Sequence, residues 1–183
     1  MRVISGEFRG RKLATPRGDE TRPTADRVKE AMFSILGPLE GTRVLDLFAG
    51  SGALGIEALS RGASHAVFVE QSRPALGALG ENLKLLGLES RTSILGVAVA
   101  RSTARVLALG PFDVALVDPP YAEVADGSVP ALLGTLIERG ALPPGAILLL
   151  EHATRDPVPV IPGTEPDRSR KYGTTTVSIY IVA

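Results

Sequence analysis

Residues 43–70 read RVLDLFAGSGALGIEALSRGASHAVFVE, and this stretch decides the fold. RVLDLF (43–48) is a run of apolar, β-prone residues, which predicts a buried strand. GSGALG (50–55) follows with a G-x-G-x-x-G pattern, and a helix is predicted from there to about residue 61. HAVFVE (65–70) predicts a second buried strand. A strand, a glycine turn, a helix and another strand in this order indicate a βαβ unit with parallel strands.

The alternation of strands and helices continues to residue 151. Apolar runs predict further strands at 92–97, 112–118 and 146–151, and helices are predicted at 73–86, 100–109 and 129–139. A helix is also predicted over 22–38, where Thr24 can cap the first turn. The tail, 167–183, splits at Gly173 into two β-prone runs, which predict an antiparallel hairpin at the edge of the sheet.

These elements predict an α/β protein with a Rossmann-like fold: a mostly parallel, seven-stranded sheet with helices on both faces. RVISGEFRGRKLA (2–14) predicts a small β-hairpin in front of that sheet. The hairpin is basic although the whole chain has a net charge of zero, and basic arms bind phosphates. The charge alone also fits a solvated surface hairpin, so we divide the chain into a basic N-terminal appendage, 1–21, for which RNA binding is one interpretation, and a main domain, 22–183.

Composition excludes several classes of protein. With 183 residues, 44% of them hydrophobic, the chain is long enough for one domain with its own core and is not a disordered protein. No apolar run is long enough for a membrane span, so we expect a cytoplasmic protein that does not bind membranes. The chain has no cysteine, which excludes disulfides, thiolate metal sites and cysteine nucleophiles.

The glycine pattern indicates a nucleotide-like ligand. Gly50, Gly52 and Gly55 lie between a strand and a helix, and Glu70 ends the next strand, where an acid can bind a ribose hydroxyl. Asp46 lies four residues before Gly50 and would repel a pyrophosphate. It would attract S-adenosylmethionine, whose ammonium and sulfonium groups are cationic. The loop therefore favours a methyl donor over NAD.

ALVDPPYAEV (115–124) is unusual for the end of a buried strand, because an acid, two prolines and a tyrosine follow the apolar run. Proline fixes φ and donates no hydrogen bond, so this turn is stiff. Asp118 and the carbonyl of Pro119 can accept the two N–H bonds of an exocyclic amine on a nucleobase and aim its lone pair at a methyl group. Tyr121 can stack on a base that has been flipped out. A route through carbon 5 of cytosine needs a cysteine, which the chain lacks.

The chain as a whole resembles one family. DLFAGSGALGIEALSRGA (46–63) and Asp-Pro-Pro-Tyr resemble class I amino-methyltransferases, and three more stretches narrow the resemblance to the RsmD family: RVISGEFRGRKL (2–13), RPTADRVKEAMFSIL (22–36) and KYGTTTVSIY (171–180). The resemblance implies transfer of a methyl group from S-adenosylmethionine to N2 of one guanine in 16S ribosomal RNA of the small subunit. It also implies S-adenosylhomocysteine as the product, no metal, and a protein that we expect to be a monomer.

The candidate site residues fall into three groups. The catalytic group is Asp118, Pro119, Pro120 and Tyr121. The donor-binding group is Thr24, Asp46, Phe48, Ala49, Gly50, Ser51, Gly52, Gly55, Glu70, Gln71, Val97 and Ala98. The RNA-binding group is Arg9, Arg11, Lys12, Arg22, Arg27 and Lys171. Val97 departs from the family pattern, since an acid that binds adenine is expected there, and Gln71-Ser72 departs from it because an acid often follows Glu70. These departures concern donor affinity and not the type of reaction.

Other readings remain open. The same chemistry could act on adenine N6 of DNA or RNA, although the chain has no room for a domain that recognises a DNA sequence. A non-catalytic RNA-binding module and an NAD oxidoreductase are two further alternatives. His152, after the strand at 146–151, is interpreted as a hydrogen-bonded structural histidine in preference to a substrate contact.

Overall fold

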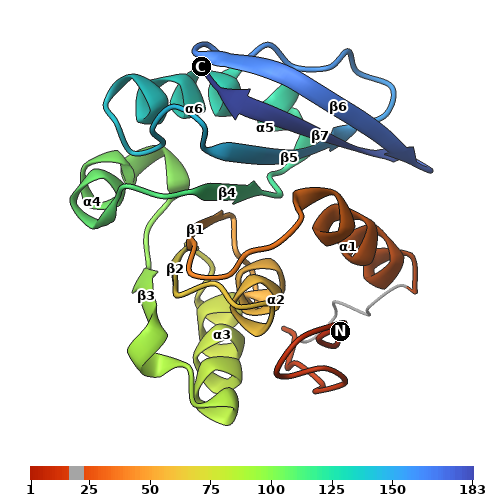
Figure 1. Cartoon of the computed structure of the whole chain (residues 1–183), viewed down its shortest axis with the longest axis vertical. Coiled ribbons are helices and arrows are strands. Elements are labelled where there is room, and N and C mark those ends of the chain that lie inside the picture. The colour runs from red at the N-terminus through yellow and green to blue at the C-terminus, as the bar shows by residue number, and fades with distance from the viewer. Residues whose placement is uncertain (17–22) are drawn as a thin grey trace.

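The computed structural model describes residues 1–16 and 23–183, and the side chains of the first helix from Val28 onward. Seven strands form one sheet in the order β3-β2-β1-β4-β5-β7-β6 (Figure 1). Strands β1 to β5 pair in parallel, β7 is antiparallel to β5, and β6 is antiparallel to β7. The α/β fold and the C-terminal hairpin at the sheet edge are both confirmed.

The elements have the following bounds. The strands are β1 (Arg43–Leu47), β2 (His65–Val69), β3 (Thr92–Leu95), β4 (Val114–Val117), β5 (Ile147–Ala153), β6 (Thr164–Tyr172) and β7 (Thr175–Val182). The helices are α1 (Pro23–Leu36), α2 (Ala53–Ser60), α3 (Arg73–Leu86), α4 (Thr103–Leu109), α5 (Tyr121–Ala125) and α6 (Ser128–Glu138), with single 3₁₀ turns η1 (Glu89–Arg91) and η2 (Val99–Arg101).

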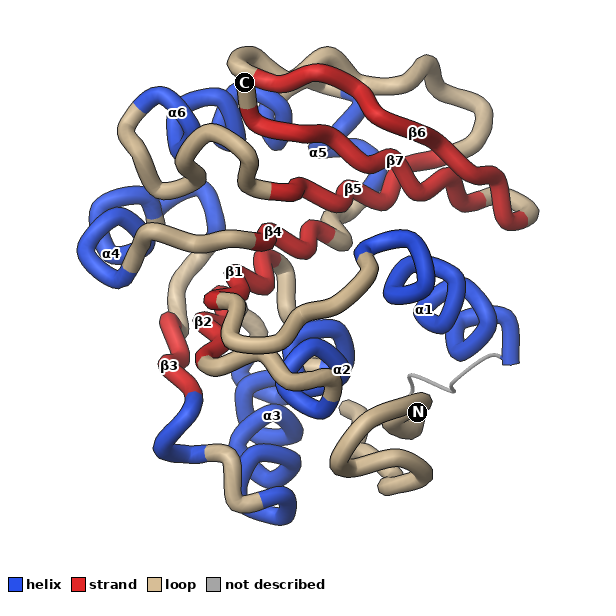
Figure 2. Tube along the Cα trace, in the orientation of Figure 1, coloured by secondary structure: helices blue, strands red, loops and turns tan. Residues whose placement is uncertain are grey.

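Helices cover both faces of the sheet, and each face has its own core. Alternate strand residues point to opposite faces, so Val44 joins one core and Leu45 joins the other. Helices α1, α2 and α3 pack on the first face, and α4, α5 and α6 pack on the second. The sheet and its helices appear in red and blue in Figure 2. Strands that are buried on both faces explain the continuous apolar runs in the sequence.

The predicted N-terminal hairpin is present in its shortest form. We call residues 1–16 the arm; one antiparallel bridge, between Arg2 and Lys12, joins its two ends. Turn-type bonds close its middle, such as the bond from the N–H of Arg11 to the carbonyl of Phe8, and other N–H groups of the arm bond to α2. Ile4 and Ser5 donate their N–H groups to the Glu57 carboxylate, at 2.8 and 3.0 Å, and Phe8 donates its N–H group to Ser60 Oγ at 3.0 Å. Since these N–H groups are used in docking, they do not form a strand ladder.

The arm is anchored on a buried polar cluster. Glu57 is fully buried and also lies 2.8 Å from Arg61 Nε and 3.4 Å from Lys29 Nζ, so its charge is paired. Gly6 allows the arm to come this close, because a Cβ atom there would lie 1.8 Å from the carbonyl oxygen of Ser60. Val3 and Leu13 are buried in the core of the first face. The division into 1–21 and 22–183 nevertheless stays a prediction.

Two details differ from the sequence-based expectation. Helix α5 was not predicted: it is a five-residue helix that begins at Tyr121, directly after the proline pair. Strand β5 extends to Ala153 and contains His152, which is buried and lies with Nε2 2.9 Å from Ser178 Oγ. His152 is therefore a structural histidine. Within the described residues, no helix is long and apolar enough to cross a membrane.

Candidate active site at the carboxyl ends of β1 and β4

The glycine loop, Phe48–Gly52, leaves the carboxyl end of β1 and enters α2. Phe48 has φ 61°, a left-handed conformation that is costly for a residue with a side chain, and Gly50 and Gly52 have φ 55° and 84°. A Cβ atom on Gly50 would meet nothing within 4 Å, so the backbone is open to a ligand at this point. The loop therefore turns sharply and presents bare main chain, as the sequence predicted.

Glu70 fixes the shape of the glycine loop. One carboxylate oxygen accepts the N–H of Gly50 at 2.8 Å, and the other accepts the N–H groups of Gln71 and Ser72 at 2.8 and 2.7 Å. The predicted ribose contact by Glu70 stays a prediction. The structure adds a bracing role, in which Glu70 ties the end of β2 to the loop that follows β1.

Asp46 lies beneath the glycine loop. It is 1% exposed, and its Oδ2 accepts the N–H of Gly55 at 2.8 Å. Burial raises the pKa of Asp46 to about 8, and the nearby carboxyls of Asp118 and Glu70 add to this effect, while the Gly55 bond opposes it. Gly55 is required for the contact, because a Cβ atom there would lie 2.3 Å from the Phe68 ring.

Asn82 is a third brace, and it was not foreseen from the sequence. It lies on α3, is 1% exposed, and donates through Nδ2 to the carbonyl of Ser51 at 3.0 Å. The same side chain bonds to Ala14 in the arm. No local pattern marks Asn82, since its partners lie 31 and 68 residues away.

The Asp-Pro-Pro-Tyr turn lies next to the glycine loop. Val117, the last residue of β4, pairs with Leu47, the last residue of β1, so Asp118 and Phe48 leave neighbouring strands at the same edge. Pro119 is buried, and Pro120 directly precedes α5. The Tyr121 hydroxyl lies 2.7 Å from Thr175 Oγ1 on β7, which ties the turn to the C-terminal hairpin. The two predicted halves of the site are therefore brought together.

Glu151 joins this group although the sequence analysis did not include it. Val117 pairs with Leu150 in parallel register, so Asp118 and Glu151 occupy equivalent positions on neighbouring strands. Asp118 is accessible to solvent, yet protein atoms crowd its carboxyl and raise its pKa to about 6. Burial, with the charge of Asp118, raises the pKa of Glu151 to about 8. The sequence feature that could have identified Glu151 as a site residue is its position as an acid at the end of an apolar strand, AILLLE (146–151).

The other predicted donor contacts follow β2 and β3. Gln71 is exposed, and its N–H is held by Glu70. Val97 packs against the core of the second face, and its N–H bonds to the carbonyl of Leu95 at 2.9 Å. Its side chain can therefore offer a bound donor only apolar contact. Ala98 is half-buried beside it. Thr24 lies in the first turn of α1, where only the backbone is described.

The predicted RNA contacts are partly visible. Arg9, Arg11 and Lys12 are exposed on the arm and form no ion pair with the residues that the structure describes. Lys171 is exposed on β6, close to the carboxyl end of β5, because the hairpin pairs Ala153 with Thr175 and Thr175 with Tyr172. Arg22 lies outside the described residues, and Arg27 lies in α1, where only its backbone is described.

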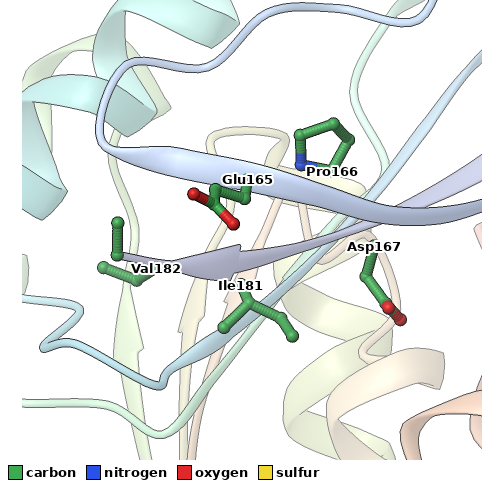
Figure 3. Close-up of a pocket in the computed structure, with 6 residues that line it drawn as sticks. Glu165, Pro166, Asp167, Ile181 and Val182 are labelled. Carbon is green, nitrogen blue, oxygen red and sulfur yellow. The ribbon is translucent and has the colours of Figure 1, made fainter.

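A pocket elsewhere on the molecule is not part of this site. It is lined by Glu165, Pro166, Asp167, Ile181, Val182 and Ala183 (Figure 3). Ile181 pairs with Ile147, the first residue of β5, so the pocket lies at the amino end of β5, whereas the glycine loop and Asp118 lie at the carboxyl ends of β1 and β4. Ligands of such sheets bind at the carboxyl ends. Among the described residues, no group of three or more His, Cys, Asp or Glu is placed to hold a metal ion.

Comparisons with known proteins agree with this geometry. Residues 1–181 match the family model described as "Conserved hypothetical protein 95". The chain is 34% identical to the ribosomal RNA small subunit methyltransferase D of Escherichia coli over 163 residues, which is 88% of this chain and 79% of that protein. The chain belongs to the RsmD family.

Two further proteins are similar to this chain over almost their whole length. YlbH of Bacillus subtilis is 40% identical over 190 residues, with 98% of each chain covered. The solved structure of yhhF from Escherichia coli superposes with a TM-score of 0.84 at 31% identity, covering 100% of this chain and 97% of the other. The prediction of a class I methyltransferase is confirmed.

Proposed function

We propose that this protein transfers a methyl group from S-adenosylmethionine to the exocyclic N2 amine of a guanine in 16S ribosomal RNA. One observation carries the proposal: the pairing of Leu47 with Val117 sets an open glycine loop beside Asp118 and Pro119. A donor loop and an amine-binding turn are then adjacent, as direct transfer requires. The names of the relatives, which are ribosomal RNA small subunit methyltransferases, support the choice of RNA.

The donor fits the residues on its side of the site. The main chain at Gly50 is open and the Glu70 carboxylate lies beside it, which suits a ligand without phosphates. A cationic ligand would also favour the ionised form of Asp46, whose pKa is raised to about 8 beneath the loop. S-adenosylmethionine, when bound, supplies an electrophilic methyl group on sulfur. Apolar contact with Val97 would hold the adenine ring, and S-adenosylhomocysteine would remain as the product.

The acceptor side prepares the amine. Asp118 and the carbonyl of Pro119 would accept the two N2–H bonds, which draws the nitrogen towards tetrahedral geometry and localises its lone pair. The new N–C bond forms as the S–C bond of the donor breaks, and the methylated amine then loses one proton. Ionised Asp118 would accept that proton. Tyr121 would stack on the base, with its ring held through the hydroxyl bond to Thr175.

The test is transfer from labelled donor to small ribosomal subunits that lack this methyl group, followed by nucleoside mass spectrometry. N2-methylguanosine is the expected product. 5-Methylcytosine as the main product would contradict the mechanism, whereas N6-methyladenine would contradict only the choice of base. Action on the assembled subunit and a monomeric state are predictions that this assay and a mass measurement in solution can check. A metal-free reaction and a cytoplasmic location also remain predictions.

The basic arm should hold RNA phosphates. Arg9, Arg11 and Lys12 are exposed and form no ion pair with the described residues, so they are available to an anion. Replacing all three by alanine should weaken RNA binding and reduce the slope of log affinity against log salt by roughly 0.7–0.9 for each lost contact. Replacing Arg105, an exposed arginine on α4 of the opposite face, is the matched control. An unchanged slope would mean that the arm has a structural role only.

A further inference from the structure

One side chain joins the arm to the glycine loop. Asn82 Oδ1 accepts the N–H of Ala14 at 2.7 Å, and Asn82 Nδ2 donates to the carbonyl of Ala14 at 3.0 Å. Nδ2 also donates to the carbonyl of Ser51 at 3.0 Å. The amide thus uses its acceptor and both of its donors, and it is 1% exposed, so water cannot replace these bonds.

The glycine loop has two other braces, and neither reaches the arm. Glu70 holds the N–H of Gly50, and Asp46 holds the N–H of Gly55. The arm in turn has its own anchors, Glu57 and Ser60, which lie on α2 beyond the loop. Asn82 hydrogen-bonds to both segments, so its amide joins the main chain at Ser51 directly to the main chain at Ala14.

We propose that Asn82 is a positioning residue that couples donor binding at the glycine loop to RNA binding at the arm. A ligand that fixes the main chain around Ser51 also fixes the amide of Asn82, and the amide then holds Ala14 in the arm. The cost of ordering the two segments is shared, so each ligand binds more tightly when the other is already bound than it does to the free protein. This inference rests on the proposed function, because it assigns the methyl donor to the loop and RNA to the arm.

The test uses two variants that cut the link from different ends. Asn82→Asp keeps the shape of the side chain and the oxygen that accepts the N–H of Ala14. It replaces Nδ2 by an oxygen, which repels the carbonyls of Ala14 and Ser51 and cannot donate to them. Ala14→Pro removes the N–H on the arm side and leaves the bond between Asn82 and Ser51 intact. Ser60→Ala is the matched control, because it removes the bonds of Ser60 Oγ to Phe8 and Ser5 in the arm without touching the glycine loop.

The measurement is the affinity for a 16S ribosomal RNA fragment with and without saturating S-adenosylhomocysteine. In the unaltered protein this product should tighten RNA binding by about fivefold or more. The ratio should fall to about one in Asn82→Asp, and it should decrease in Ala14→Pro, which keeps the bond from Asn82 Nδ2 to the Ala14 carbonyl. It should persist in Ser60→Ala, even if that control binds RNA more weakly overall. A ratio that persists in both link variants would overturn the proposal.

Amide hydrogen exchange gives a second readout that needs no ligand. Asn82→Asp should speed exchange in the arm and at Ser51 and Gly52 together, whereas Ser60→Ala should speed it in the arm alone. Faster exchange confined to the arm in Asn82→Asp would also overturn the link. If the unaltered protein methylates RNA but the ratio is unchanged by the link variants, only this inference fails. If it binds no S-adenosylhomocysteine, the proposed function fails, and the exchange data still decide the link.

Discussion

Asp46 and Glu70 accept hydrogen bonds from backbone N–H groups of the glycine loop, whereas Asp118 and Glu151, on the other side of the site, accept none from the described residues. The two pairs lie near the ends of neighbouring strands, and each consists of one aspartate and one glutamate. The first pair holds a loop in one shape before any ligand arrives. The second pair is crowded by protein atoms and has no hydrogen-bond donor among the described residues, so its oxygens can accept N–H bonds from a substrate.

This difference separates a preformed donor side from an acceptor side that is completed by the base. Carboxylates that brace a loop act through structure, and their loss should reduce donor affinity. Carboxylates without partners act on the reacting atoms, and their loss should reduce the rate of transfer while donor binding stays the same. The predictions below test each half of this contrast, beginning with the largest expected effect.

Asp118→Ala should lower the single-turnover rate on the order of a hundredfold or more, since it removes a contact that strengthens in the transition state. Affinity for S-adenosylhomocysteine, measured by calorimetry, should be unchanged. The single-turnover rate of Asp118→Asn, which keeps one acceptor oxygen, should lie between the rates of the alanine variant and the unaltered protein. If the alanine variant loses donor affinity but transfers at the normal rate, the roles of the two sides are reversed.

The rate should also depend on pH through Asp118. Partial desolvation by the surrounding protein atoms raises the pKa of Asp118 to about 6, and the carboxyl is expected to accept both N–H bonds best when it is ionised. The single-turnover rate should therefore be level above about pH 7 and fall below pH 6, by about tenfold at one further pH unit. Rapid-quench assays at saturating donor and RNA measure this profile. A profile that is flat down to pH 5 would mean that Asp118 is not the titrating acceptor.

Glu70→Gln should show the opposite behaviour. An amide cannot accept N–H groups on both of its ends, so Gly50 or the pair Gln71 and Ser72 would lose a partner. Donor affinity should weaken by about fivefold or more, which corresponds to the loss of one net hydrogen bond. The rate at saturating donor should be nearly normal. Glu81→Gln, at an exposed position on α3, is the matched control.

How far the sequence predicted this site depends on where each partner lies in the chain. The donor loop was predicted because Asp46, Gly50, Gly55 and Glu70 fall within one βαβ unit, whose strand, turn and helix are marked by local patterns. The Asp-Pro-Pro-Tyr turn was predicted in the same way, from an apolar run and two prolines. The strand order then placed the two motifs side by side, which is a general property of doubly wound sheets.

Asn82 and Glu151 could not be found by the same reasoning. Glu151 reaches Asp118 only because β5 pairs with β4 in a register that the sequence does not specify. Asn82 lies on a helix that reads as an ordinary amphipathic element, and its partners become neighbours only when the arm docks on α2. The short form of the N-terminal hairpin has the same origin, since Glu57 and Ser60 compete for the N–H groups that a ladder would use.

The smallest predicted effect concerns stability and tests whether Glu151 is held protonated. Its pKa is raised to about 8 in the folded protein by burial and by Asp118, from an ordinary value of 4.5. Between these values Glu151 binds more protons in the folded state than in the unfolded state, so the free energy of unfolding must fall as pH rises from about 4.5 to 8.

Glu151→Gln removes this pH dependence. As pH rises over that interval, the free energy of unfolding of the variant should increase relative to that of the unaltered protein by on the order of 1 kcal/mol. Asp46, whose pKa is raised in the same direction, keeps part of the slope in both proteins. Urea unfolding at pH 5.5, 7 and 8.5 measures the difference, and an equal slope in the two proteins would show that Glu151 is ionised and hydrated like an ordinary surface acid.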